Sequence, residues 1–220
     1  VNTVDDEAGS PWARSVAQAS RPAMRLRDGD DRPIDAPAQL RAGVRVAATA
    51  ADLVFADGPR TAAELFDAAR AGRLAPFALP GTMTLRTRSH IDHIESRNVL
   101  GMLPGSDPAR AAQSIVHTAH LDHLGNGAPV DGDAIYNGAL DNALGVAILI
   151  EAARELAQAD AAPARSTLFA ALTAEEHGLL GAQWLVAHPP AAAGRLVANI
   201  NIDMPVLTAP TRDIIAIGSE

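Results

Sequence analysis

The chain has 220 residues, 48 % apolar and 20 % charged, which suffices for one α/β domain or for a domain and part of another. Its net charge of −8 argues against a nucleic-acid surface, because phosphate binding needs clustered cations. The absence of cysteine excludes disulfides, thiolate metal sites and cysteine nucleophiles, so any metal ion must bind to histidine and carboxylate groups.

The first hundred residues carry weak patterns. Residues 1–52 are rich in Asp, Arg, Pro and Ala, and the segment 40–54 is expected to form one or two strands. Residues 59–71 are predicted to be a helix, because a proline begins them and a glycine follows. Alternating apolar residues in 81–97 predict a strand, and 98–104 predict a short second strand that could pair with it as a hairpin.

From residue 114 onward, strands alternate with helices. The predicted strands are 114–119, 166–172, 196–202 and 214–217, and the predicted helices are 140–158 and 179–188. This alternation implies a largely parallel sheet covered on both faces. Ligands of such sheets bind outside the carboxyl ends of the strands.

Histidine and carboxylate residues follow these strand ends. They come from four separate elements of the sequence: His120 and Asp122, Asp141, Glu175 and Glu176, and Asp203. Each has an ordinary alternative role, such as a helix cap, a solvated loop pair or a turn residue. Because all four elements deliver them to one edge of one sheet, the sequence favours metal-dependent hydrolysis.

The spacing of these residues suggests how each one could act. In an extended chain His120 and Asp122 lie on the same side, so the carboxylate can accept one ring N–H and leave the other nitrogen for a metal ion. His117 and His123 have the opposite parity, which suits packing or a position at the pocket rim. Asn142 can cap the long helix and leave its neighbour Asp141 free.

The carboxylates at the other positions suit a site with two metal ions. Asp141 could bridge two cations, one oxygen to each. Glu175 and Glu176 point different ways at a strand end, so one can bind metal while the other faces the substrate as a general base. Asp203 ends a buried strand, where a bound cation would offset its burial.

Four segments resemble the co-catalytic dizinc exopeptidases of the aminopeptidase and glutamate-carboxypeptidase superfamily: 119–125, 137–146, 174–181 and 199–204. The resemblance covers roughly residues 94–220. It implies a three-layer α/β/α domain with a mostly parallel mixed sheet, incomplete at its C-terminal end. Residues 1–52 then correspond to the remnant of an inserted protease-associated domain and its linker, and residues 53–220 to a partial catalytic domain.

The resemblance also implies roles for single residues. His120 and Asp203 would bind one zinc ion and Glu176 the other, with Asp141 bridging the two. Asp122 would orient His120, and Glu175 would be the general base. The implied reaction is hydrolysis of the N-terminal peptide bond of a peptide or protein by a metal-activated water.

The chain departs from this family in one respect. Members supply a further histidine downstream of the residue that corresponds to Asp203, whereas the last histidine here is His188. The second zinc site is then expected to have only Asp141 and Glu176 from this chain. We therefore expect the chain to be a fragment that alone binds fewer than two zinc ions and is inactive.

The same metal site is also compatible with other functions. One is a non-catalytic relative that acts as a binding or scaffold protein, and the others are glutaminyl cyclisation and carboxypeptidase action. The intact pair Glu175 and Glu176 favours an enzyme. The family suggests an extracellular or periplasmic location, although the sequence shows neither a signal peptide nor an apolar stretch of about 18 residues that would span a membrane.

Overall fold

The computed structural model describes residues 1–205 except 29, 31, 35–38 and 40–41. The predicted strand 214–217 therefore lies outside the described residues. The chain divides between Asp92 and His93 into two compact units. The expected domain boundary at residue 52 falls inside the first unit, and the origin of residues 1–52 in an inserted domain stays a prediction.

The first unit is built from short helices. They are α1 (Val4–Gly9), α2 (Trp12–Ala19), η1 (Ala48–Ala50), α3 (Ala51–Phe55) and α4 (Ala62–Arg70). The prediction of a helix over 59–71 is confirmed by α4, which Thr61 and Glu64 cap reciprocally. The strands expected in 40–54 are wrong for the described residues, because the alanine-rich segment 47–51 favours helix instead.

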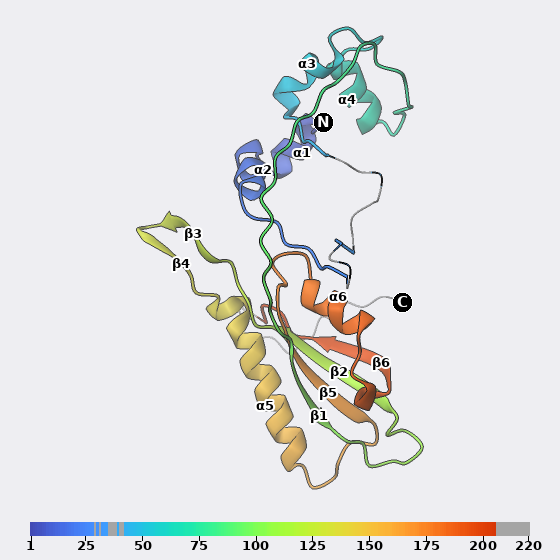
Figure 1. The fold of residues 1–220 in the computed structure, drawn as a ribbon, viewed down its shortest axis with the longest axis vertical. Coiled ribbons are helices and arrows are strands. Elements are labelled where there is room, and N and C mark those ends of the chain that lie inside the picture. Colours follow the sequence, from blue (N-terminus) through green and yellow to red (C-terminus); the bar gives the residue numbers. More distant parts are fainter. Residues whose placement is uncertain (29, 31, 35–38, 40–41, 206–220) are drawn as a thin grey trace. The chain divides into compact units, whose positions relative to one another are not determined.

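The second unit is an α/β domain (Figure 1). Its elements are β1 (Val99–Leu103), β2 (Gln113–His120), β3 (Gly125–Val130), β4 (Asp133–Tyr136), η2 (Ala139–Ala143), α5 (Leu144–Gln158), β5 (Ser166–Leu172), α6 (Leu180–Ala187), η3 (Ala191–Ala193) and β6 (Arg195–Asn201). The predicted strands and helices between residues 114 and 202 are confirmed within a few residues at their ends.

The main sheet has the strand order β1-β5-β2-β6. Strand β2 is parallel to both of its neighbours, whereas β1 is antiparallel to β5. In this register His120 lies opposite Leu172, and Thr118 lies opposite Asn201. The carboxyl ends of the three parallel strands therefore meet at one edge of the sheet, as expected.

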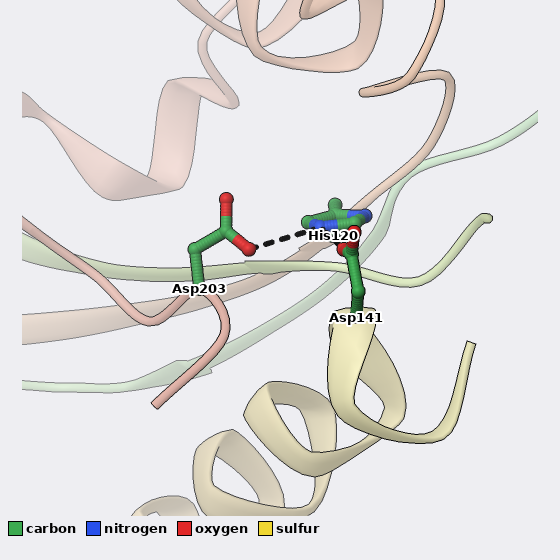
Figure 2. A group of neighbouring side chains, drawn as sticks. All are labelled: His120, Asp141 and Asp203. Carbon is green, nitrogen blue, oxygen red and sulfur yellow. Dashed lines mark hydrogen bonds and ion pairs between the residues drawn. The ribbon is translucent and has the colours of Figure 1, made fainter. Parts of the chain in front are cut away.

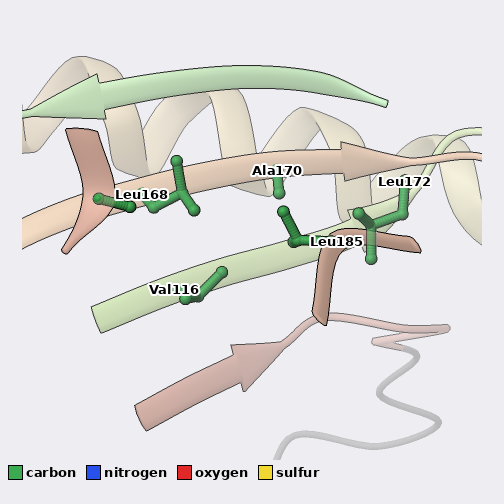
Figure 3. Close-up of a cluster of buried hydrophobic side chains, with 6 residues drawn as sticks. Val116, Leu168, Ala170, Leu172 and Leu185 are labelled. Atoms are coloured by element: carbon green, nitrogen blue, oxygen red, sulfur yellow. The ribbon is translucent and has the colours of Figure 1, made fainter. Parts of the chain in front are cut away.

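Two apolar clusters cover the two faces of the sheet. On one face, Leu185 of α6 packs with a cluster that includes Val116 and Leu168 (Figure 3). On the other face, Leu149 of α5 packs with Ala119 and Phe169. Successive strand residues alternate between these clusters, as the period of two requires. The predicted three-layer α/β/α arrangement with a mostly parallel mixed sheet is confirmed.

The hairpin expected upstream of the sheet does not form. Residues 82–97 are all described and contain no strand, and β1 pairs with β5 instead. The actual hairpin joins β3 to β4 through Asp131 and Gly132, which have φ of 50° and 88°. Asp-Gly is the preferred pair for such two-residue turns, so the sequence carried a signal for this hairpin.

Among the described residues, no helix combines the length and the apolar composition needed to cross a membrane.

Candidate metal centre

All six predicted site residues lie at or near the carboxyl edge of the main sheet. His120 is the last residue of β2, Asp141 lies in η2 before α5, and Asp203 follows β6. Their side chains, with others, form two groups: His120, Asp141 and Asp203; and His123, Asp141 and Glu176. Within each group the potential ligand atoms all lie within 4.8 Å of one another. Asp141 belongs to both groups.

The first group surrounds the ring of His120 (Figure 2). Its Nε2 atom lies 3.0 Å from Oδ1 of Asp141 and 3.2 Å from Oδ1 of Asp203. On the other side of the ring, Nδ1 donates to the backbone carbonyl of Asp122 at 2.9 Å. Because a carbonyl only accepts, Nδ1 carries the proton and Nε2 is the nitrogen available to a metal ion.

The surroundings of His120 also change its affinity for protons. The residue is only 4 % exposed, and this burial opposes protonation. The hydrogen bond to the Asp122 carbonyl and the negative charge of Asp203 outweigh burial, so the pKa of His120 is raised. A metal ion at this position must therefore compete with a proton.

The structure corrects the role expected for the Asp122 carboxylate. Its Oδ1 atom is 3.9 Å from Nδ1 of His120, too far for a hydrogen bond. That oxygen instead accepts the backbone N–H of Glu175 at 3.1 Å. Asp122 thus orients His120 through its backbone carbonyl, and its carboxylate holds the loop that carries Glu175.

The second group contains His123, whose strand parity predicted a position outside the metal site. Nδ1 of His123 lies 2.8 Å from Oε1 of Glu176 and 3.7 Å from Oδ2 of Asp141. The opposite parity of His123 predicted packing or a position at the pocket rim, but parity holds only within a strand, and β2 ends at His120. The sequence did carry a signal for His123, since it is the third polar residue within the four residues 120–123. His117 does pack, since its ring stacks on Phe169 with centroids 5.3 Å apart.

Asp141 turns one carboxylate oxygen toward each histidine. Oδ1 lies 3.0 Å from Nε2 of His120, and Oδ2 lies 3.7 Å from Nδ1 of His123. This is the arrangement that a carboxylate bridging two cations needs.

Asn142 holds Asp141 and Asp203 near each other. It is 2 % exposed, and its Nδ2 donates to the carbonyl of Ile202 at 2.8 Å. Its Oδ1 accepts the backbone N–H of Gly145 at 3.1 Å and that of Met204 at 3.3 Å. Asn142 thus binds a backbone N–H in the first turn of α5, while the neighbouring Asp141 points toward His120. The peptide bond between the two residues is cis.

Asn98 positions the loop after β5 in a similar way. Its Oδ1 accepts the backbone N–H of Thr173 at 3.1 Å, and its Nδ2 donates to the carbonyl of Gly181 at 2.8 Å. A Cβ at Gly181 would lie 2.6 Å from Oδ1 of Asn98, so the close approach requires glycine. The role of Asn98 was not predicted, because its hydrogen-bond partners are more than seventy residues away in the sequence.

Glu175 and Glu176 face different surroundings. Glu175 lines a cavity of about 560 Å³, together with His120 and Asp203. Much of the remaining lining is apolar and includes Leu172, Leu179, Leu185, Val186 and Leu196. Burial, followed by the charges of Glu176 and other nearby carboxylates, raises the pKa of Glu175 despite the opposing effect of His120. Glu176 belongs to the group around His123 instead.

The two groups fit zinc ions in chemistry and in spacing. Imidazole nitrogens and carboxylate oxygens are ordinary zinc ligands, and tetrahedral ligands about 2.0 Å from the ion are about 3.3 Å from one another. The four nitrogen–oxygen distances run from 2.8 to 3.7 Å. In addition, Nδ1 of His123 and Oε1 of Glu176 are buried and have no hydrogen-bond partner among the described residues, which is consistent with a cation site.

Comparisons with known proteins point to one family. A "Probable zinc metalloprotease" from Pyrenophora teres f. teres is 42 % identical over 107 residues, which are 48 % of this chain and 22 % of that protein. A protein of the same description from Pyrenophora tritici-repentis is 42 % identical over 79 residues, 36 % of this chain and 18 % of that protein. This chain thus spans about a fifth of the length of the curated relatives it matches.

Among solved structures, this chain is similar to BSAP, a zinc aminopeptidase from Bacillus subtilis. The two share 31 % identity with a TM-score of 0.37, over 49 % of this chain and 24 % of the other. The model of the family described as "Peptidase family M28" matches residues 98–220, which is more than half of the chain. The chain therefore belongs to peptidase family M28.

Proposed function

We propose that the protein is a zinc-dependent exopeptidase that hydrolyses the N-terminal peptide bond of a peptide or protein. The observation that carries the proposal is the pair of histidine–carboxylate groups that share Asp141, with Glu175 beside them at the cavity. Membership of a peptidase family supports it, as do relatives described as a probable zinc metalloprotease.

Four residues of the predicted site would hold two zinc ions. His120 and Asp203 would hold one ion and Glu176 the other, and Asp141 would contribute to both. When bound, zinc supplies Lewis acidity that activates a water molecule and polarises the scissile carbonyl. Asn142 and the Asp122 carbonyl orient these ligands before any ion binds.

Glu175 is the general base in this proposal. Its carboxylate takes a proton from the attacking water and passes it to the leaving amine. Burial among other carboxylates raises the pKa of Glu175, which makes it a better proton acceptor than an exposed glutamate. The hydrogen bond from its backbone N–H to Asp122 fixes the loop at this point.

The same metal site is compatible with a carboxypeptidase, a glutaminyl cyclase or a scaffold protein without activity. A glutamate with a raised pKa in the cavity wall favours an enzyme over a scaffold. Three substrates separate the enzymes: an aminoacyl anilide, a peptide blocked at its N-terminus, and a peptide that begins with glutamine. The proposal expects the protein with both zinc ions bound to turn over the first.

Substitution of the base tests the mechanism. Glu175→Ala is expected to lower kcat on an aminoacyl anilide at least about 100-fold, the usual loss on removing a general base, while zinc content stays unchanged. Zinc is measured by elemental analysis of the purified protein. Glu155→Ala, on the exposed side of α5, is the matched control and is expected to keep wild-type activity. Activity retained by Glu175→Ala would remove that residue from the mechanism.

A further inference from the structure

We propose that Asn98 is a positioning residue for the general base Glu175. The inference rests on the proposed function, because it concerns the base of that reaction. Asn98 lies directly before β1 and outside both histidine–carboxylate groups. It acts on residues 173–181, the segment between β5 and the first turn of α6 that carries Glu175, which we call the base loop.

Asn98 joins the two ends of the base loop. Its Oδ1 accepts the backbone N–H of Thr173 at 3.1 Å, and its Nδ2 donates to the backbone carbonyl of Gly181 at 2.8 Å. Thr173 directly follows β5, and Gly181 is the second residue of α6. One half-buried amide therefore sets how far the end of the strand lies from the start of the helix.

Thr173 is held by all of its polar groups. Its N–H donates to Asn98, its carbonyl accepts the N–H of Gly181 at 3.0 Å, and its hydroxyl oxygen lies 2.6 Å from that of Ser96. Thr173 is two residues before Glu175. These contacts therefore fix the direction in which the chain enters the segment that carries the base.

The base loop contains strained backbone next to the base. Ala174 and Leu179 have φ of 54° and 60°, in the left-handed region that residues with a Cβ rarely adopt. Such conformations persist only where the surrounding structure holds them. The two hydrogen bonds of Asn98 hold the residues that flank this segment, so without them Ala174 is expected to relax and to turn Glu175 away.

Glu175 depends on this support more than Glu176 does. In the part of the chain that the structure describes, the Glu175 carboxylate has no hydrogen bond, and only its backbone is held, through Asp122. Glu176 would instead be held by a bound zinc ion under the proposed function. Displacement of the base loop should therefore affect the base first, and a shift of about 1 Å can cost up to about 100-fold in rate.

Gly181 offers a second way to displace the base loop. A Cβ at this position would lie 2.6 Å from Oδ1 of Asn98 and would also overlap the carbonyl oxygen of Thr173. Gly181→Ala therefore pushes the ends of the loop apart and leaves the side chain of Asn98 unchanged. It gives an independent test if Asn98→Ala does not fold.

The first experiment is a double-mutant cycle on the protein with both zinc ions bound. Asn98→Ala is expected to lower kcat on an aminoacyl anilide about tenfold at saturating zinc, with KM changed less than about twofold. In a Glu175→Ala background it is expected to change kcat less than about twofold, because the base is already absent. A residue that acts through zinc binding or through general stability would cost the same in both backgrounds.

Two further variants complete the cycle. Gly181→Ala is expected to show the same dependence on Glu175 as Asn98→Ala. Asn126→Ala, on the exposed strand β3, is the matched control and is expected to keep wild-type kcat in both backgrounds. Elemental analysis verifies that all variants carry the same amount of zinc.

The second experiment measures amide hydrogen exchange in the metal-free chain. In Asn98→Ala the amides of Thr173 and Gly181 are expected to exchange at least about tenfold faster, because the base loop opens more often. The amides of β2 and of the middle of β5 are expected to exchange as in the wild type, which also verifies that the variant folds.

The outcomes separate this inference from the proposed function. An equal loss of kcat in both backgrounds, or unchanged exchange of the base loop, would overturn the role of Asn98 and leave the proposed function standing. Wild-type activity in Glu175→Ala, or a zinc-loaded protein that does not cleave the anilide, would overturn the proposed function and this inference together.

Discussion

At the scale of single residues, Asp122 contacts His120 as predicted, but through its backbone carbonyl and not through its carboxylate. The spacing of His120 and Asp122 predicted that they interact, and they do. However, the contact uses the backbone carbonyl, because the carboxylate has turned to the N–H of Glu175. The sequence specifies the neighbour, whereas the choice between carbonyl and carboxylate depends on a loop that lies 53 residues away.

This difference predicts a separable effect of Asp122 substitutions. Asp122→Ala removes the acceptor for the Glu175 N–H, a bond contributing about 1 kcal/mol, so kcat is expected to fall about fivefold. The affinity for the zinc ion at His120 is expected to change little, because the carbonyl remains. Asp122→Asn keeps an acceptor oxygen and is expected to stay near wild-type kcat. A 10- to 100-fold loss of zinc affinity in Asp122→Ala would instead show that the carboxylate supports His120.

At the scale of elements, apolar periodicity predicted the strands and helices that build the site. Strand β5 is almost fully buried, β2 is mostly buried and β6 is mostly exposed, yet the apolar residues of all three predicted strands, and their ends place the polar residues correctly. Residues 81–97 have strand periodicity too, but alternation does not supply a pairing partner, and β1 pairs with β5 instead. His123 was missed because the chain leaves the strand at His120, so its side chain no longer follows strand parity.

The connection between α5 and β6 depends on one buried side chain. Asn142→Ala removes three hydrogen bonds and leaves the carbonyl of Ile202 and two N–H groups without that partner. We expect the free energy of unfolding to fall by about 3 kcal/mol, and zinc affinity at His120 to fall with it, because Asp141 and Asp203 lose their common support. Chemical denaturation and zinc titration measure the two effects.

The control for this substitution is Asn137→Ala, five residues earlier. Asn137 is exposed and makes only one hydrogen bond among the described residues, at 3.3 Å to Ile135. Its removal is expected to change stability by less than about 0.5 kcal/mol. Equal effects of the two substitutions would argue against a special role for Asn142.

At the scale of the whole molecule, the metal centre joins segments that the backbone leaves apart in sequence. Its proposed ligands come from the end of β2, the turn before α5, and the loops after β5 and β6. An ion that binds only the folded arrangement stabilises it, by about 2.7 kcal/mol when its concentration is 100 times the dissociation constant. The carboxylates of the centre repel one another without a cation, so this stabilisation is expected to be large.

The size of this stabilisation should depend on pH in a direction set by His120. The pKa of His120 is raised above the ordinary value of 6.5. In the metal-free protein, the stability that His120 contributes to folding is therefore complete below about pH 6.5, and it is lost as the pH rises through the pKa of the folded state. Zinc binds only the neutral ring, and its affinity therefore rises over the same range.

Thermal unfolding with and without zinc, followed by circular dichroism, tests this linkage. The increase in Tm caused by zinc is expected to grow between about pH 6 and about pH 8. Over this range the metal-free protein loses the stability contributed by protonated His120, and the zinc ion no longer competes with a proton for the ring. His120→Ala is expected to show a smaller increase with little dependence on pH in this range. An increase in Tm that stays constant or shrinks as the pH rises would contradict the raised pKa of His120 and its place among the zinc ligands.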